Sequence, residues 1–292
     1  TPAFIHGGPF ANIAHGCNTL IATRTAQQYA DIVLTEAGFG SDLGAEKFFD
    51  IKARYGDLDV AGAVIVATVR SIKHNAGVAK SELSNENVAA LEEGIVNLER
   101  HVENVRKFGV TPVVALNRFA TDTDAELDFL RNWADAKGIA LADANVWAEG
   151  GDGATELAET LLDNLTEGSS KPLYDPADGV EASIETIAKE IYRADNVQYS
   201  AAALKDLKTL KENGFDTLPV CVSKTQYSFS DDASALGAPE GHTLHVRELL
   251  PRTGSGFIVV LTGNVMTMPG LPKNPAANNI DVDKQGTISG LF

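Results

Sequence analysis

The sequence predicts an α/β protein built on a parallel sheet, and three observations support this class. Short apolar runs of strand length alternate with segments of helical spacing through the first 165 residues. The run at 61–69, AGAVIVATV, is continuously apolar, which is typical of a parallel strand buried on both faces. Strands that alternate with helices join through right-handed crossovers into one parallel sheet. We therefore expect a parallel sheet with helices on both faces and a smaller C-terminal α+β domain.

The predicted elements follow in order along the first part of the chain. Ile32–Leu34 is the apolar centre of a strand that ends in a glycine-rich turn, and residues 45–56 form the next helix. After the strand at 61–69, the segment Asn87–Lys107 has apolar residues at alternating spacings of three and four, which predicts a helix with a core-facing stripe. The remaining predictions here are strands at 111–117 and 138–147 and helices at 121–134 and 153–165.

The periodicity lapses at residues 167–179, where Ser, Pro, Asp and Gly gather, and we expect a domain boundary there. The residues 267–292 contain too much Pro, Asn and Gly for regular structure, but their apolar residues predict a tail that docks on the body. We expect domains at 1–100, 101–178 and 179–292. The elements predicted between boundary and tail are helices Val180–Tyr192 and Ala201–Asn213 and strands at 218–228, 242–249 and 256–263.

Composition excludes several classes of function. The chain of 292 residues carries a formal net charge of −16, which would repel a phosphate backbone and argues against nucleic acid as a partner. Cys17 and Cys221 lie far apart and suit a reducing compartment. No apolar run is long enough for a membrane span, and no signal-peptide pattern opens the chain. We expect a cytoplasmic protein without a membrane partner.

Unusual segments follow the predicted strands, and parallel sheets bind ligands at the carboxyl ends of their strands. Gly38, Gly40 and Gly44 precede a helix whose free N–H groups could hold an anion, although a purely structural turn explains them as well. The next strand ends in a segment that contains Arg70, Lys73, His74 and Asn75, and its two cations suit a phosphate or carboxylate. The alternative for that segment is a solvated loop.

Two aromatic residues, Phe119 and Trp147, come just past the next two strands. A flat heterocycle could stack between such rings, whereas the alternative is that each ring packs in the core. Trp133 lies within a helical stripe and is expected only to pack. The sequence therefore predicts a ligand site at one sheet edge if both rings are accessible.

The chain resembles the C-terminal half, or slightly more, of proteins of the formate–tetrahydrofolate ligase family, and the likeness runs from Thr1 to Phe292. The segment 66–77 looks like a family signature, with departures at Ser71, Ile72 and Ala76 that are conservative in size. The matching segments are HGGPFANIAHGCN at 6–18, TEAGFGSDLGAEKFFD at 35–50, VATVRSIKHNAG at 66–77, NRFATDT at 117–123, VWAEGG at 146–151, LPVCVSKTQYSFSDD at 218–232 and TGNVMTMPGLPKNPAANNID at 262–281.

The resemblance implies ATP-dependent formylation of tetrahydrofolate. In this family formate takes the γ-phosphoryl group of ATP to give formyl phosphate, and N10 of the folate then attacks the formyl carbon. Such chemistry needs positive charge and hydrogen-bond donors around a phosphoryl group. The implied substrates are formate, tetrahydrofolate and ATP with Mg²⁺, a monovalent cation is a further candidate, and members are typically homo-oligomers.

The resemblance also implies roles for residues of this chain. Phe119 and Trp147 would sandwich the pterin of the folate. Gly38, Gly40, Gly44 and Arg70 would lie near the nucleotide or phosphate, and His6 and Asn12 would act at the transferring group.

One family feature is missing from these 292 residues, because no GxxxxGK[ST] phosphate-binding loop occurs in them. We expect that motif in an N-terminal half or a companion chain, and Thr1 at the start fits a piece of a longer protein. The isolated chain is then expected to make no formyl phosphate.

Two other classes of function stay open. One is a non-catalytic fragment that keeps folate binding or only the fold. The other is a nicotinamide-dependent oxidoreductase built on the glycine turn, which requires an acidic residue at the end of the next strand, where this chain has Arg70.

Overall fold

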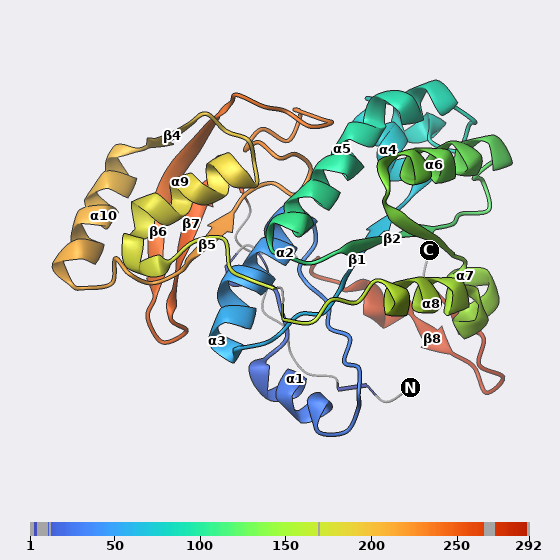
Figure 1. Cartoon of the computed structure of the whole chain (residues 1–292), viewed down its shortest axis with the longest axis horizontal. Coiled ribbons are helices and arrows are strands. Elements are labelled where there is room, and N and C mark those ends of the chain that lie inside the picture. Colours follow the sequence, from blue (N-terminus) through green and yellow to red (C-terminus); the bar gives the residue numbers. More distant parts are fainter. Residues whose placement is uncertain (1–2, 5–10, 12, 169, 266–271, 291–292) are drawn as a thin grey trace.

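The computed structural model describes all residues except 1–2, 5–10, 12, 169, 266–271 and 291–292. Within the described residues, strands β1, β2 and β3 form a parallel sheet in that order, as the alternating pattern predicts. In Figure 1, helices α4, α5 and α6 cover one face of this sheet and α8 lies against the other. The bounds are β1 Ala63–Ala67, β2 Pro112–Asn117, β3 Ala140–Ala144, α4 Val69–Asn75, α5 Val88–Lys107, α6 Asp124–Lys137 and α8 Thr155–Asp163.

A second, mixed sheet lies in the C-terminal part, with strand order β4-β6-β7-β5. β4 runs parallel to β6 and β5 parallel to β7, whereas β6 and β7 are antiparallel. Sequence reasoning missed β4 because its four residues are only partly buried and carry no apolar run. The bounds are α9 Val180–Glu190, β4 Asn196–Tyr199, α10 Ala201–Glu212, β5 Val220–Ser223, β6 Thr243–Arg252 and β7 Phe257–Thr262.

The N-terminal part differs from the prediction at one strand. Ile32–Leu34 lies in irregular structure, so the predicted strand is wrong. Three apolar residues alone do not hold an extended segment that has no strand beside it to pair with in the described structure, and Ile32 and Leu34 are exposed. The helical elements around it are α1 Leu20–Gln27, α2 Ser41–Lys47, a π-helical segment Phe48–Ala53 and α3 Arg54–Gly56, which confirm a helix at 45–56 and begin it earlier.

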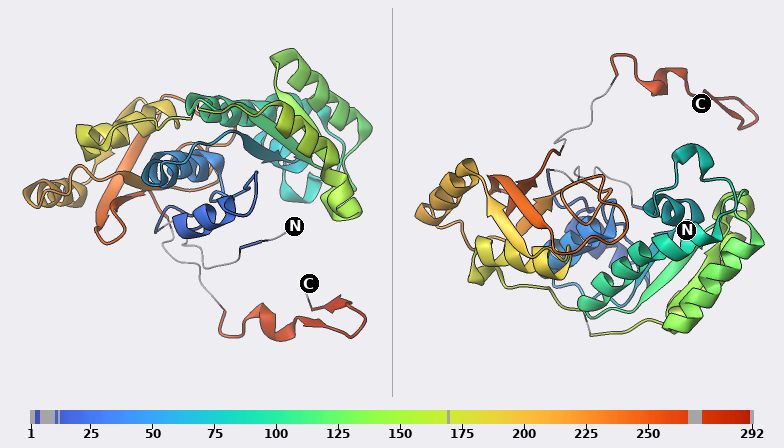
Figure 2. Two further views of the ribbon diagram at one scale, coloured as in Figure 1. Left: turned by 60° about the horizontal axis from the view of Figure 1, so that its bottom comes forward. Right: turned by 90° about the horizontal axis from the view of Figure 1, so that it is seen from above.

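The described part of the tail, residues 272–290, does not dock on the body, so that prediction is wrong there. All described residues from 272 onward are exposed, and Figure 2 shows this segment standing apart from the rest of the molecule. Its sparse apolar residues, such as Ile280 and Val282, offer too little area to hold it there. Its regular structure is limited to a 3₁₀ turn Ala276–Asn279 and the two-residue strands β8 Asp281–Val282 and β9 Ile288–Ser289.

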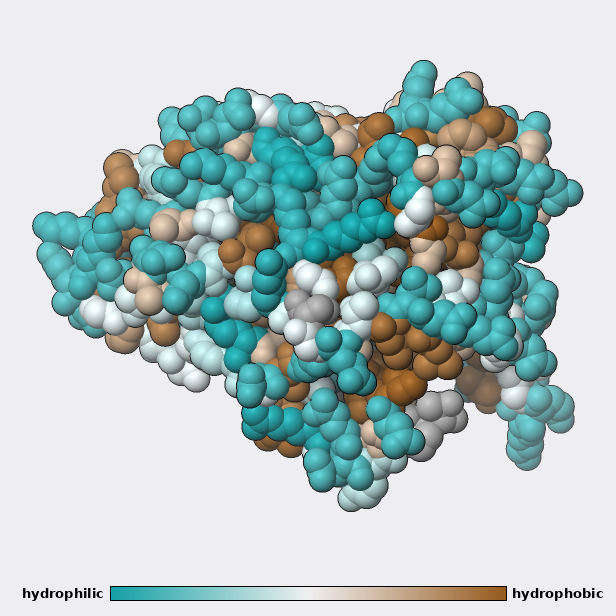
Figure 3. Space-filling model, viewed as in Figure 1, coloured by the Kyte–Doolittle hydropathy of each residue, from teal (hydrophilic) through white to brown (hydrophobic). Residues whose placement is uncertain are grey.

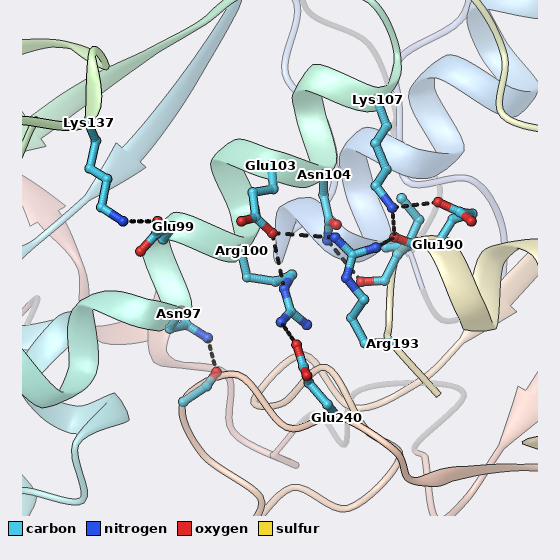
Figure 4. A network of polar contacts seen from close by, with 12 residues as sticks. Asn97, Glu99, Arg100, Glu103, Asn104, Lys107, Lys137, Glu190, Arg193 and Glu240 are labelled. Atoms are coloured by element: carbon cyan, nitrogen blue, oxygen red, sulfur yellow. Dashed lines mark hydrogen bonds and ion pairs between the residues drawn. The ribbon is translucent and has the colours of Figure 1, made fainter. Parts of the chain in front are cut away.

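Helix α5 joins the two sheets through polar contacts along one side (Figure 4). Lys107 Nζ lies 2.6 Å from Glu190 Oε2, and Asn104 Nδ2 donates to the Ile191 carbonyl at 3.0 Å. Asn97 Nδ2 donates to the Gly237 carbonyl at 2.7 Å.

The division into domains at 1–100, 101–178 and 179–292 stays a prediction. β1 from the first of these ranges shares a sheet with β2 and β3 from the second. No helix of the described residues is both long and apolar enough to cross a bilayer.

Two carboxyl groups are buried in the helical segment that begins at Ser41. Glu46 and Asp50 are both inaccessible to solvent. Burial raises the pKa of Glu46 well above its ordinary value, and the neighbouring Asp50 carboxylate adds to this effect. Burial also raises the pKa of Asp50 to about 7. The hydrogen bond that the Leu173 N–H donates to Asp50 lowers this pKa but does not outweigh burial. The pair therefore holds a proton in the folded state that the unfolded chain loses.

This pair should make stability fall as the pH rises. Native protein binds more protons than unfolded protein between the unfolded pKa of 3.8 and about 7, so Asp50 lowers the free energy of unfolding across that window and no further above it. The slope is about 1.4 kcal/mol per pH unit. Asp50→Asn should remove the part of the slope that Asp50 contributes, while the part that Glu46 contributes through its own burial stays, so the variant gains stability relative to the parent chain up to about pH 7. Urea unfolding at several pH values measures this difference, and a pH-independent difference would contradict it.

Candidate functional site

The segments that follow the three parallel strands lie at the same end of the first sheet, beyond the carboxyl ends of β1, β2 and β3. Arg70 follows β1, Phe119 follows β2 and Trp147 follows β3. The register pairs Ala67 with Leu116 and Asn117 with Ala144, so the three strands end level with one another. Parallel sheets bind ligands at this end, in the loops beyond the carboxyl ends of their strands. The structure therefore places Arg70 and Phe119 in contact and Trp147 beyond the end of the adjacent strand.

Arg70 lies over the ring of Phe119. Its guanidinium carbon is 5.4 Å from the ring centroid, within the range of a cation–π contact. Phe119 is 41% exposed, so one side of the ring is open to a ligand. In the described part of the chain, Arg70 has no carboxylate partner. The pair thus presents an aromatic face and an uncompensated positive charge side by side.

Trp147 lies in the short helix α7 (Val146–Glu149) and is 91% exposed. The loop that carries it closes tightly, because the Asn145 N–H donates to the Gly153 carbonyl at 2.9 Å. A Cβ on Gly153 would lie 2.5 Å from the Asn145 carbonyl oxygen, so only glycine fits there. Core packing therefore does not account for Trp147. Trp133, by contrast, packs at the margin of the core, as expected.

Phe119 is held by a turn that uses Asp122. The Phe119 N–H donates to Asp122 Oδ2 at 2.9 Å, and the Asp122 N–H donates back to the Phe119 carbonyl at 3.0 Å. Burial raises the pKa of Asp122 above its ordinary value, and the Phe119 N–H opposes this rise. The turn fixes the backbone at the ring and leaves the ring itself open.

Behind this turn lies a buried ion pair that sequence reasoning missed. The prediction that Lys73 helps to hold an anion is wrong, because its ammonium is buried against Glu126. Lys73 Nζ on α4 is 2.8 Å from Glu126 Oε1 on α6, and both side chains are almost completely buried. Glu126 Oε1 also accepts from the Asn87 N–H at 2.9 Å, and Lys73 donates to the Asn85 carbonyl at 2.9 Å. The pair ties the helix that carries Arg70 to the helix that begins after the Phe119 turn.

The sequence did hold a signal for Glu126. Thr123 caps α6, and Glu126 three residues later accepts from the Thr123 N–H at 3.2 Å, which is a capping box. Burial disfavours the charged Glu126, but the hydrogen bond from Lys73 and those from the Asn87 and Thr123 N–H groups outweigh burial and lower its pKa. The pattern Thr-x-x-Glu predicts the cap, whereas the partner Lys73 is distant in sequence and could be found only from the fold.

The glycine turn is packed closely against its own helix. Gly40 begins α2 with φ of +80°, and a Cβ on Gly44 would lie 1.8 Å from the Gly38 carbonyl oxygen. Close packing is therefore enough to explain why position 44 is glycine, without any ligand at the turn. Next to the turn, Ser41 Oγ lies 2.6 Å from His101 Nδ1. An anion-binding role for Gly38, Gly40 and Gly44 stays a prediction.

His6 and Asn12 lie outside the described residues, so their predicted catalytic role stays a prediction. The described residue between them, Ala11, receives a hydrogen bond at its carbonyl from the buried Lys47 Nζ at 2.9 Å. Among the residues that the structure describes, no three His, Cys, Asp or Glu side chains converge as metal ligands.

Comparison with known proteins gives one consistent result. The family model described as formate–tetrahydrofolate ligase matches residues 1–292. A formate–tetrahydrofolate ligase of Corynebacterium diphtheriae is 65% identical over 292 residues, which are 100% of this chain and 53% of that protein. One from Corynebacterium jeikeium is 62% identical (100% and 51%), and one from Staphylococcus aureus is 57% identical (100% and 53%). The chain spans about half the length of the curated relatives it matches.

Proposed function

Because the chain belongs to the formate–tetrahydrofolate ligase family, we propose that it supplies the folate-binding half of an ATP-dependent ligase that joins formate to tetrahydrofolate. The observation that carries this proposal is the pair of accessible rings, Phe119 and Trp147, which follow adjacent parallel strands at one sheet edge. An indole as exposed as that of Trp147 is costly in water unless a ligand or partner covers it.

The two rings suit the flat bicyclic pterin of tetrahydrofolate. A pterin stacked between them would bury both exposed aromatic faces and displace water from them. Stacking of a base on an aromatic side chain is worth about 1–3 kcal/mol, and a pterin is similar in size and polarity to a base. The Asp122 turn then has a clear purpose, because it orients Phe119 without covering the ring.

Arg70 provides the positive charge that the reaction needs. A formate oxygen attacks the γ-phosphorus of ATP, the bond to ADP breaks, and formyl phosphate forms. N10 of the folate then attacks the formyl carbon, the carbon–oxygen bond to phosphate breaks, and N10 loses its proton. We propose that the guanidinium of Arg70 binds the phosphoryl oxygens and stabilises the charge on the departing phosphate. His6 and Asn12 are proposed to donate hydrogen bonds at the same centre.

The remaining partners are proposed from the family alone. We place the phosphate-binding loop for ATP, and the ligands for Mg²⁺ and any monovalent cation, in the half of the polypeptide that this chain does not contain. Mg²⁺ would neutralise phosphate charge there. We further propose that the complete enzyme is a cytoplasmic homo-oligomer and that this chain alone does not turn over ATP.

Fluorescence titration tests the folate site directly. In a Trp133→Phe background, Trp147 is the only remaining tryptophan of the chain. Adding tetrahydrofolate should change its emission in a saturable way, because the indole passes from water to a stacked environment. Saturable binding without ATP-dependent product formation is the expected result for the isolated chain. Unchanged emission together with no heat of binding in calorimetry would contradict the folate site, and ligase turnover would contradict the missing ATP half.

The nicotinamide alternative loses support from the fold. A dinucleotide-binding turn must follow a strand, and the described residues before Gly38 form no strand. The strand after the turn, β1, ends at Ala67, and the charged residue that follows it is Arg70, which cannot accept hydrogen bonds from ribose hydroxyls. A fragment that binds folate without catalysis is the second candidate, and the titration above separates it from a chain that only folds.

A further inference from the structure

Arg118 lies between the two segments that carry the site rings. It follows β2 and precedes Phe119, and its N–H donates to the Ala144 carbonyl at 3.1 Å. This hydrogen bond continues the pairing of β2 with β3 beyond their last register pair, Asn117 with Ala144. Trp147 comes three residues after Ala144. The backbone of Arg118 is therefore fixed where the ring-bearing segments leave adjacent strands.

The guanidinium of Arg118 is only loosely held. Its Nη1 lies 3.5 Å from Asp143 Oδ2, it makes no hydrogen bond to another described residue, and the side chain is 36% exposed. Arg131 Nη2 donates to the same oxygen at 2.6 Å, and this hydrogen bond raises the pKa of Arg131 above its ordinary value. Asp143 is therefore engaged mainly by Arg131. It orients the Arg118 side chain but leaves the N–H donors of the guanidinium available to a ligand.

The other cations beside the rings already have a partner or a proposed task. The segments that follow β1, β2 and β3, at 68–76, 118–123 and 145–154, contain as Lys or Arg only Arg70, Lys73 and Arg118. Lys73 is buried against Glu126. Arg70 contacts the Phe119 ring and is proposed to bind phosphoryl oxygens. Arg118 is therefore the accessible cation of these segments that has no assigned ligand.

Tetrahydrofolate brings negative charge to a protein that is itself strongly negative. Its aminobenzoyl-glutamate tail ends in two carboxylates, whereas the chain has a formal net charge of −16. Hydrophilic side chains cover most of the face seen in Figure 3. Repulsion of a dianion by like charge is offset only where a cation is placed locally. A planar guanidinium suits this task, because it donates two parallel hydrogen bonds to one carboxylate.

We propose that Arg118 binds a carboxylate of the glutamyl tail of tetrahydrofolate and so makes the site prefer folates to pterins that lack this charge. The inference rests on the proposed function, because it takes the pterin to lie between Phe119 and Trp147. The tail leaves the pterin through N10, so its carboxylates lie outside the ring sandwich, where the Arg118 side chain is accessible. Arg70 and Arg118 then bind different anionic groups, the phosphoryl group at Arg70 and the tail at Arg118.

The test compares two ligands on this chain, tetrahydrofolate and its diamide, in which both tail carboxylates are neutral amides. Isothermal calorimetry should show that the parent chain binds tetrahydrofolate about tenfold more tightly than the diamide, because only a carboxylate forms charged hydrogen bonds with the guanidinium. Arg118→Met should lose this preference while keeping the parent's affinity for the diamide. Arg118→Lys keeps the charge without the planar fork and should keep part of the preference. The preference should also shrink as the salt concentration rises.

Arg106→Met is the matched control, because it removes the same charge from an exposed arginine in the last turn of α5, before β2 begins. This variant should keep the full preference for tetrahydrofolate. Equal affinity of the parent chain for the two ligands would overturn the role of Arg118 and leave the folate site standing. A preference that survives in Arg118→Met, or that Arg106→Met also removes, would overturn it as well. Failure of the parent chain to bind either ligand would contradict the proposed function, and this inference with it.

Discussion

Replacing Glu126 with alanine should lower the free energy of unfolding by about 3–5 kcal/mol, the cost of leaving one member of a buried ion pair alone. The variant strands the Lys73 ammonium in the interior with only the Asn85 carbonyl as a partner, and it leaves the Asn87 N–H without its acceptor. It also removes the capping box at the start of α6. Urea unfolding at neutral pH measures the loss.

Two further variants separate the buried pair from ordinary surface charge. Glu99→Ala removes an ion pair with Lys137 that is partly open to solvent and should cost less than about 1 kcal/mol. Lys73→Met combined with Glu126→Gln removes the stranded charge and should recover much of the loss. A loss in Glu126→Ala no greater than in Glu99→Ala would mean that the buried pair contributes nothing.

The effect of Glu126→Ala should depend on pH with a definite sign. The pKa of Glu126 is lowered in the folded chain, so its contribution is complete above the ordinary value of 4.5 and is lost as the pH falls through the lowered pKa. The stabilities of variant and parent should therefore converge in acid. This direction is opposite to that of Asp50, whose pKa is raised by burial.

The sequence predicted the parts of the fold that depend on local pattern. The spacing of apolar residues in Asn87–Lys107 predicts α5, and the apolar runs predict β1, β2 and β3, because periodicity reports directly which side chains are buried. The sequence-based prediction failed where pairing between strands decides whether a segment is a strand. Ile32–Leu34 is apolar enough for a strand but has no neighbour in the described structure, and β4 is a strand because β6 lies beside it.

In the candidate site too, the residues that follow strands could be predicted from the sequence, whereas contacts between distant residues could not. Phe119 and Trp147 were found because they follow strands, and topology places the ends of neighbouring parallel strands together. The contact of Arg70 with Phe119, and the pair of Lys73 with Glu126, join residues about 50 positions apart in sequence, so no local pattern could reveal them. The prediction that the run AGAVIVATV at 61–69 is buried on both faces is wrong, because Val64 is 38% and Val66 is 67% exposed. A continuous apolar run does not show that one face of its strand stays open.

Replacing both site rings should abolish most of the affinity for tetrahydrofolate. Loss of stacking costs about 1–3 kcal/mol per ring, so Phe119→Ala or Trp147→Ala should each weaken binding by roughly 5- to 150-fold. If the rings act independently on one pterin, the double variant weakens binding by roughly 30- to 20,000-fold. The fold should tolerate both changes, because Trp147 is almost fully exposed and Phe119 lies outside the buried core clusters. Isothermal calorimetry measures the affinity without relying on tryptophan emission.

Conservative and distant replacements make the stacking explanation specific. Trp147→Phe and Phe119→Tyr keep an aromatic face and should retain most of the affinity, whereas Trp147→Leu keeps apolar area alone and should not. Phe215→Ala removes a partly exposed ring that follows α10, outside the first sheet, and should leave binding unchanged. If leucine at 147 served as well as phenylalanine, the rings would provide only apolar area. Wild-type affinity in the double alanine variant would place the pterin elsewhere.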